Sequence, residues 1–74
     1  MTGRRIRVRG QVQGVGFRPF VWALARRFGV SGEVSNDAEG VLVLAAGGDL
    51  DGFEAALSAE SPVLARVDAV EGVP

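Results

Sequence analysis

The residues best suited to chemistry in this sequence gather in one stretch, residues 10–20, which reads GQVQGVGFRPF. Gly14 and Gly16 let the backbone approach a ligand closely because neither carries a Cβ. A glycine-containing loop that leads into a helix can turn several backbone N–H groups toward one anion, and the helix N-terminus favours negative charge. Arg18 stands where this loop becomes helix, and a guanidinium can bind two phosphate oxygens at once. The stretch therefore predicts a phosphate site; the plainer interpretation is a turn beside a solvated arginine.

Asn36 is the second candidate site residue, because it follows a predicted strand and its amide could hold a water or a ligand oxygen. The spacing alone favours another interpretation, in which Asn36 only begins a hairpin turn. Asp37 and Glu39 are interpreted as turn and solvent residues, since neither has a visible partner for acid–base work.

The residue types that are missing exclude several classes of site. The 74 residues include no cysteine, no histidine and no lysine, and all eight basic residues are arginine. Disulfides, thiolate nucleophiles, Cys/His metal sites, Ser-His-Asp triads and lysine-dependent phosphate loops are therefore excluded. The glycine spacing is not a dinucleotide fingerprint either, because the third glycine would fall at Pro19. We expect no metal and no cofactor.

The charges are divided along the chain, although the formal net charge is only −1. Residues 1–28 hold seven arginines and no acid, whereas residues 29–74 hold one arginine and all nine acids. Such a division predicts either an anionic ligand near the first half or ion pairs between the two halves. No apolar run approaches the roughly 20 residues that span a bilayer, and the basic start lacks a signal-peptide core. We therefore expect a cytoplasmic protein with no membrane partner.

The hydrophobic pattern predicts six elements within one domain, residues 1–74. Residues 4–10 alternate, with Ile6 and Val8 on one side of a strand and arginines on the other. A helix is expected from Pro19 to Gly29, with the stripe Phe20, Leu24 and Phe28 facing the core. Strands at 30–35 and 41–45 are expected to form a hairpin joined by residues 36–40. A second helix, capped by Asp49, ends before Ser61, and a last strand covers 63–70.

This order of elements predicts an α+β fold: a ferredoxin-like βαββαβ sandwich with an antiparallel sheet and two helices on one face. The open face would carry Arg5, Arg7 and Arg9. Ferredoxin-like RNA modules bind through such a face, but neither residues 4–10 nor residues 41–45 supply an aromatic side chain to stack a base. We therefore expect no nucleic-acid partner.

The motifs GQVQGVGFR and GEVSN together resemble the acylphosphatase signature, and the resemblance runs from Ile6 to about Val70. The longer strings VQGVGFRPFVWALA and LARVDAV are more similar to the N-terminal acylphosphatase-like domain of hydrogenase maturation carbamoyltransferases, the HypF family. The resemblance implies a fragment of a longer multidomain protein that acts on acyl phosphates, most specifically carbamoyl phosphate. Its expected partners are the other domains of the same transferase and a hydrogenase maturation protein.

The same resemblance implies the roles of the site residues. Arg18 would clamp the phosphate and Asn36 would orient the attacking water, with no metal and no covalent phosphoenzyme. The phosphate-binding set would be Gln13, Gly14, Val15, Gly16, Phe17 and Arg18. An alternative with the same residues is a module that binds the acyl phosphate, or joins domains, without turnover. Members of this fold usually carry a short strand after the position of Val70, so we expect the closing C-terminal strand to be missing.

Overall fold

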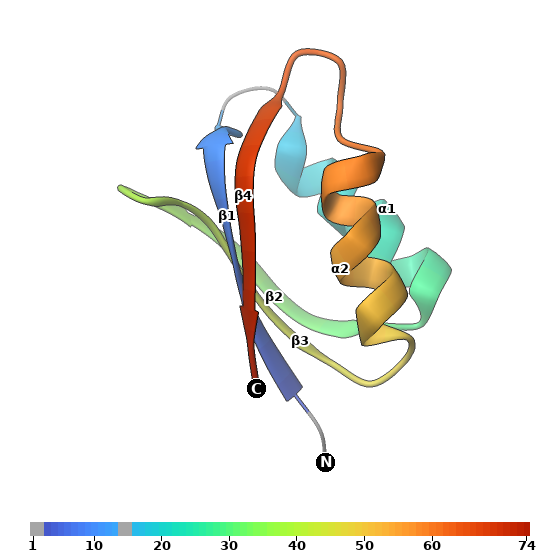
Figure 1. Cartoon of the computed structure of the whole chain (residues 1–74). Coiled ribbons are helices and arrows are strands. Elements are labelled where there is room, and N and C mark those ends of the chain that lie inside the picture. Colours follow the sequence, from blue (N-terminus) through green and yellow to red (C-terminus); the bar gives the residue numbers. More distant parts are fainter. Residues whose placement is uncertain (1–2, 14–15) are drawn as a thin grey trace.

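The computed structural model describes residues 3–13 and 16–74, and its elements follow the predicted order. Strand, helix, strand, strand, helix and strand succeed one another along the chain (Figure 1). The elements are β1 (Gly3–Gln11), α1 (Phe17–Phe28), β2 (Ser31–Asp37), β3 (Gly40–Ala46), α2 (Leu50–Ala59) and β4 (Arg66–Val73).

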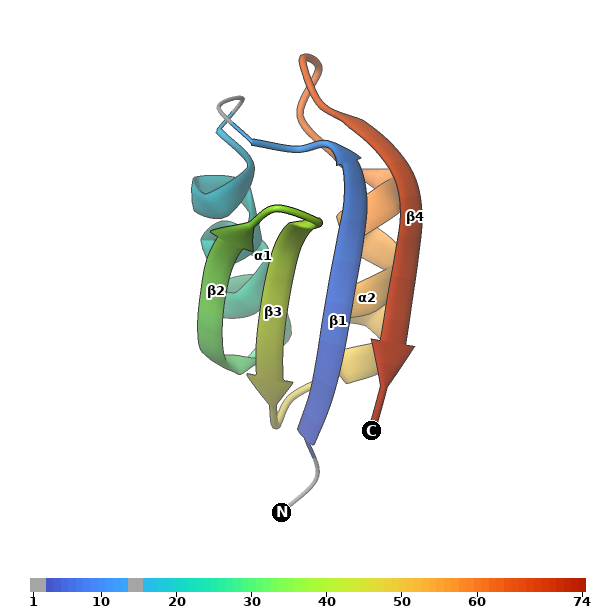
Figure 2. The same cartoon turned by 90° about the vertical axis from the view of Figure 1, so that its left-hand side faces the viewer.

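The four strands form one sheet in the order β2-β3-β1-β4, and every neighbouring pair is antiparallel. Both helices cover the same face of this sheet, and the other face is open (Figures 1 and 2). The predicted ferredoxin-like α+β sandwich is therefore confirmed. β1 lies in the interior of the sheet, so the loop that follows it emerges beside both β3 and β4.

The hydrophobic core lies between the sheet and the two helices. In β1, Ile6 and Val8 are completely buried, and the alternation places Arg5, Arg7 and Arg9 on the open face as predicted. The helices and the neighbouring strands supply the rest of the core. Its large, fully buried side chains are Phe17, Phe53, Ile6, Leu57, Val8, Val12 and Val41.

Helix α1 begins at Phe17, two residues before the predicted start at Pro19. Gly16 is its N-cap, with φ 77°, in the left-handed region that favours glycine. The buried face is Phe17, Val21 and Leu24, whereas Phe20 is only half-buried. The predicted stripe does face the core, since Leu24 is buried and Phe20 and Phe28 pack partly buried against it, and the earlier start of the helix adds Phe17 to that face.

The β2–β3 hairpin is tighter than predicted. The register pairs Asp37 with Gly40, so Ala38 and Glu39 alone make the connection instead of five residues. Asn36 belongs to β2, where it pairs with Val41. The sequence did not predict that β2 extends to Asp37, because Asn and Asp are more typical of turns than of strands.

The last strand corrects two expectations. β4 covers Arg66–Val73, three residues later than predicted, because Val63 and Leu64 lie in the preceding loop with 98% and 78% of their surfaces exposed. The final strand of the sheet is therefore present, and the expectation of a missing closing strand is wrong. The chain itself supplies that strand, which pairs with β1 as far as Val73.

The division of charge is largely explained by ion pairs between the two halves of the chain. Six acids of the second half lie within 3.4 Å of arginines of the first, and one of these pairs is Arg27–Glu60. The pairs at 2.6–3.4 Å are Arg4–Asp51, Arg4–Glu54, Arg7–Asp37, Arg9–Glu39 and Arg9–Glu71.

Among the helices of the described residues, none is long and apolar enough to cross a membrane.

Candidate functional site

The N-terminus of α1 supplies backbone N–H groups that the helix itself does not use. The first hydrogen bond of the helix runs from the Phe20 N–H to the Gly16 carbonyl, at 3.3 Å. The N–H groups of Phe17 and Arg18 come before it, and Pro19 has no N–H. Gly16 offers no side-chain cap, and the first turn contains no acid. Among the described residues no group accepts from these two donors, so they and the end of the helix dipole can face an anion.

Arg18 extends this site with a positive side chain. The residue is exposed, and its guanidinium forms no ion pair with any residue that the structure describes. This differs from Arg4, Arg7, Arg9 and Arg27, each of which pairs with an acid. No acid among the described residues therefore occupies its hydrogen-bond donors, and its role as a phosphate clamp stays a prediction.

Phe17 contributes to the site only through its backbone. Its side chain is 1% exposed and lies in the core, where its ring meets Phe20 edge-on with 5.2 Å between centroids. This burial fixes the first turn of α1 against the sheet and so fixes the N–H groups of Phe17 and Arg18. The predicted role of Phe17 in phosphate binding requires no more than that.

The remaining predicted loop residues differ in what the structure says of them. Gly14 and Val15 lie outside the described residues. Gly16 is the helix cap, and a Cβ built on it would meet nothing within 4 Å, so the space beside it is open. The Gln13 side chain donates to backbone carbonyls of the β2–β3 hairpin, a contact that the sequence did not predict. No residue pattern signals it, since the two segments are 24–27 residues apart.

Asn36 lies on the same side of the sheet as the helices. It shares a face of β2 with Val34, two residues away, and Val34 lines a shallow hollow together with Arg18. Asn36 itself is exposed and does not line that hollow, and its side chain makes no hydrogen bond to Arg18 in the part of the chain that the structure describes. The structure thus places both candidates on the same side of the sheet, and their roles in catalysis remain predictions.

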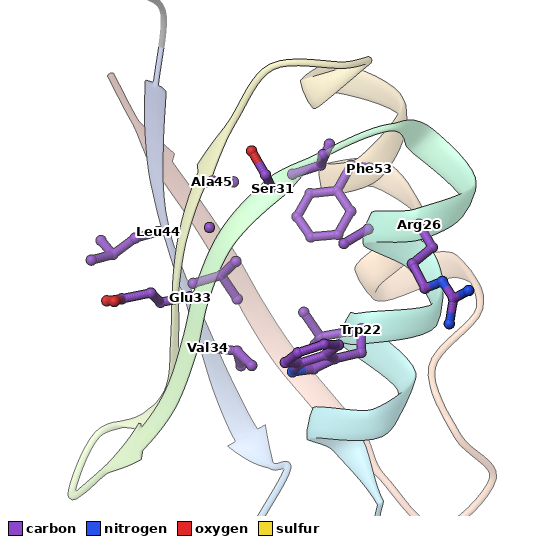
Figure 3. Close-up of a pocket in the computed structure, with 13 residues that line it drawn as sticks. Trp22, Arg26, Ser31, Glu33, Val34, Leu44, Ala45 and Phe53 are labelled. Atoms are coloured by element: carbon purple, nitrogen blue, oxygen red, sulfur yellow. The ribbon is translucent and has the colours of Figure 1, made fainter.

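A deeper hollow continues from Arg18 along the space between α1 and β2. It has a volume of about 260 Å³ and is lined mainly by apolar side chains, with Phe53 at its floor (Figure 3). Trp22 and Arg26 stand on its α1 wall and are shared with the shallow hollow at Arg18. Trp22 is 65% exposed, in agreement with its place off the core-facing stripe. Trp22 lies with Arg18 on this surface, and an exposed tryptophan near an arginine is a local signal that could have pointed to it.

Two contacts at the β2–β3 hairpin stabilise the ionised form of the Asp37 carboxylate. Arg7 lies 2.6 Å from the Asp37 carboxylate and lowers the pKa of that group below its ordinary value. The backbone N–H of Glu39 also donates to Asp37, at 2.9 Å, and lowers the pKa further. Asp37 is therefore ionised at neutral pH and acts as a structural anion of the turn. Asp37 is the last residue of β2 and not a turn residue as predicted, and Arg7 is a partner that the sequence did not reveal.

The first helix of this antiparallel βαββαβ sandwich begins with N–H groups and an arginine that have no partner among the described residues. Such an α+β fold can bind an anion at a helix start. Residues 4–73 match the family model described as Acylphosphatase. The chain belongs to the acylphosphatase family, and that match covers nearly all of it.

The similar proteins are of two kinds, HypF carbamoyltransferases and separate acylphosphatases. It is 69% identical over 71 residues to "Carbamoyltransferase HypF" from Rhodobacter capsulatus, covering 96% of this chain and 10% of that protein. It resembles the crystal structure of acylphosphatase from Bacillus subtilis with TM-score 0.90 and 36% identity, over 99% of this chain and 83% of that one. The crystal structure of full-length HypF in the phosphate- and nucleotide-bound form gives TM-score 0.90 and 32% identity, over 96% and 10%. The chain thus spans about a tenth of the HypF relatives and most of a separate acylphosphatase.

Proposed function

We propose that this chain is an acylphosphatase-type hydrolase domain, which cleaves an acyl phosphate into a carboxylate and inorganic phosphate. The observation that carries the proposal is the open N-terminus of α1, where Arg18 has no ion-pair partner among the described residues. Membership of the acylphosphatase family supports the same chemistry.

In this proposal the substrate phosphate sits at the start of α1. The N–H groups of Phe17 and Arg18 donate to its oxygens, and the Arg18 guanidinium binds two of them. The loop residues Gln13, Gly14, Val15 and Gly16 would complete the cradle through their backbones. The N–H groups of Phe17 and Arg18 are fixed before the substrate arrives, because the Phe17 side chain is held in the core. They therefore stabilise charge that develops on the phosphoryl oxygens without reorganising.

Asn36 would place the attacking water. An amide does not take up a proton at neutral pH, so Asn36 can orient water but cannot deprotonate it. The water oxygen bonds to phosphorus while the bond from phosphorus to the acyl oxygen breaks. The carboxylate leaves with that electron pair, and a phosphate oxygen accepts the proton of the water. Charge and atoms balance without a metal, since the two negative charges of the acyl phosphate appear as one carboxylate and one dihydrogen phosphate.

The relatives suggest the particular substrate and setting. A "Carbamoyltransferase HypF" at 69% identity supports carbamoyl phosphate as the acyl phosphate. Its products would then be carbamate and phosphate, and the other domains of such a transferase would be the partners. Hydrogenase maturation in the cytoplasm is proposed from the resemblance of the sequence motifs alone.

A second function is supported by the small share of HypF that the chain covers, about 10%. A domain within a large transferase could hold an acyl phosphate, or contact its neighbours, without turning it over. The same cradle and Arg18 would serve both roles, so binding alone does not separate them. Turnover by the isolated 74-residue chain does.

The deciding experiment is steady-state hydrolysis of benzoyl phosphate and carbamoyl phosphate by the chain and its arginine variants. We expect Arg18→Ala to lose at least about 100-fold in kcat/KM, the scale for one transition-state charge partner. The matched control is Arg5→Ala: Arg5 is also exposed and has no ion pair among the described residues, but it lies on the opposite face of the sheet. Equal losses in the two variants would remove the assignment. Phosphate binding without hydrolysis by the unmodified chain would favour the binding module.

A further inference from the structure

The Gln13 side chain joins the proposed phosphate loop to the hairpin that carries Asn36. Its amide nitrogen donates to the carbonyl of Asp37 at 2.5 Å and to the carbonyl of Gly40 at 3.2 Å. A glutamine amide has two N–H donors, and both are used here. The opposite orientation of the amide is unfavourable, because its oxygen would then face two carbonyl oxygens, which have no hydrogen to donate.

The two acceptors are the residues that close the β2–β3 turn. Asp37 is the last residue of β2, Gly40 is the first of β3, and the two pair with each other in the register. Asn36 is the residue immediately before Asp37. A shift of the Asp37 carbonyl therefore moves the backbone of Asn36 with it.

Other contacts hold this turn by its side chains instead of its backbone. Arg7 binds the Asp37 carboxylate at 2.6 Å, and Arg9 reaches the Glu39 carboxylate at 3.4 Å. Both arginines come from β1, so they fix the turn to the sheet but not to the loop before α1. Among the described residues, Gln13 alone connects that loop to the turn by a side-chain hydrogen bond.

We infer that Gln13 is a positioning residue, whose side chain sets the distance between the phosphate held at the start of α1 and the water held by Asn36. The inference rests on the proposed function. In-line attack requires the water oxygen and phosphorus to lie about 3–3.5 Å apart, and a misplacement of about 1 Å costs on the order of 100-fold in rate. Gln13 would thus act on turnover through Asn36, while phosphate binding depends on Arg18 and the backbone donors.

The test compares Gln13→Leu with Gln11→Leu. Gln11 is a matched control, since it is the same residue type two positions earlier, is also exposed, and makes no side-chain hydrogen bond within the described residues. We expect Gln13→Leu to lower kcat about 10- to 100-fold, with the inhibition constant for inorganic phosphate changed by less than about twofold. Gln11→Leu should match the unmodified chain. Gln13→Met, an unbranched replacement, is the second variant if Gln13→Leu does not fold by circular dichroism.

A double-mutant cycle with Asn36→Ala distinguishes a positioning role from a general one. If Gln13 acts through Asn36, adding Gln13→Leu to Asn36→Ala changes kcat by less than about twofold. Additive losses, or a parallel loss of phosphate affinity, would overturn the inference while leaving the hydrolase function standing. If the unmodified chain proves inactive, amide hydrogen exchange decides: faster exchange at residues 36–40 in Gln13→Leu alone supports the link, and unchanged exchange refutes it.

Discussion

Phe17 allows the role of a side chain near the site to be tested separately from the role of its backbone N–H. The side chain is 1% exposed and packs edge-on against Phe20, whereas the N–H lies at the open start of α1. Removing a buried phenylalanine ring costs about 3–5 kcal/mol, from lost burial and the cavity left behind. A 74-residue domain has only about 4–11 kcal/mol of stability, so Phe17→Ala should leave the chain close to unfolding. Phe17→Leu keeps most of the apolar volume and should cost about 1–2 kcal/mol.

Urea unfolding followed by circular dichroism measures these losses, and phosphate titration below the transition measures the site. Phe17→Leu should bind phosphate as the unmodified chain does, because its backbone N–H is unchanged. Phe20→Ala, which removes the half-buried partner ring, should cost less than Phe17→Ala. The reasoning is refuted if Phe17→Ala costs under about 1 kcal/mol, or if Phe17→Leu is stable but no longer binds phosphate.

Two further outcomes follow from the hairpin and the helix cap. Gly40→Ala should destabilise the chain by at least about 2 kcal/mol more than Gly16→Ala in thermal unfolding. A Cβ at Gly40 would lie 2.2 Å from the Val8 carbonyl oxygen, whereas a Cβ at Gly16 would meet no described residue within 4 Å. Equal losses would show that the close approach is unimportant. Arg7 lowers the pKa of Asp37 in the folded state, so this group's contribution to stability is present above its ordinary value of 3.8 and is lost as the pH falls through the lowered value. Asp37→Asn should therefore be less stable than the unmodified chain at pH 7, and the difference should shrink steadily as the pH falls below 3.8; a difference that does not shrink in acid contradicts this origin.

The fold could be predicted because the strongest local signals agree with one another. The alternation of Ile6 and Val8 with arginines marks β1, and Gly29 ends α1 as predicted, with φ 69°. Errors appeared where a local preference was overruled by the sheet. Asn36 and Asp37 prefer turns, yet pairing with β3 draws both into β2.

β4 was misplaced for a related reason. Val63 and Leu64 are apolar and were assigned to a strand, but the structure exposes both in the preceding loop. The register of β4 is set by its partner instead: Val70 pairs with Val8, and the strand continues to Val73. Such pairing joins segments about 60 residues apart, and no short window of sequence contains it.

The candidate site was predicted unevenly. Arg18 at a helix start follows from local sequence, and the structure adds that no acid within the described residues neutralises it. The link from Gln13 to the β2–β3 turn could not be predicted, because it depends on where the hairpin folds back onto the loop. The same is true of the hollow beside Trp22, which exists only once α1 packs over β2 (Figure 3).

Titration of ¹⁵N-labelled chain with inorganic phosphate, followed by NMR, tests most directly whether the start of α1 is the phosphate site. We predict that the amide signals of Phe17 and Arg18 and the guanidinium signal of Arg18 shift together and saturate at one dissociation constant. That constant should equal the inhibition constant of phosphate in acyl phosphate hydrolysis. Shifts centred on Arg5 and the open sheet face, with the signals of Phe17 and Arg18 unmoved, would contradict the account.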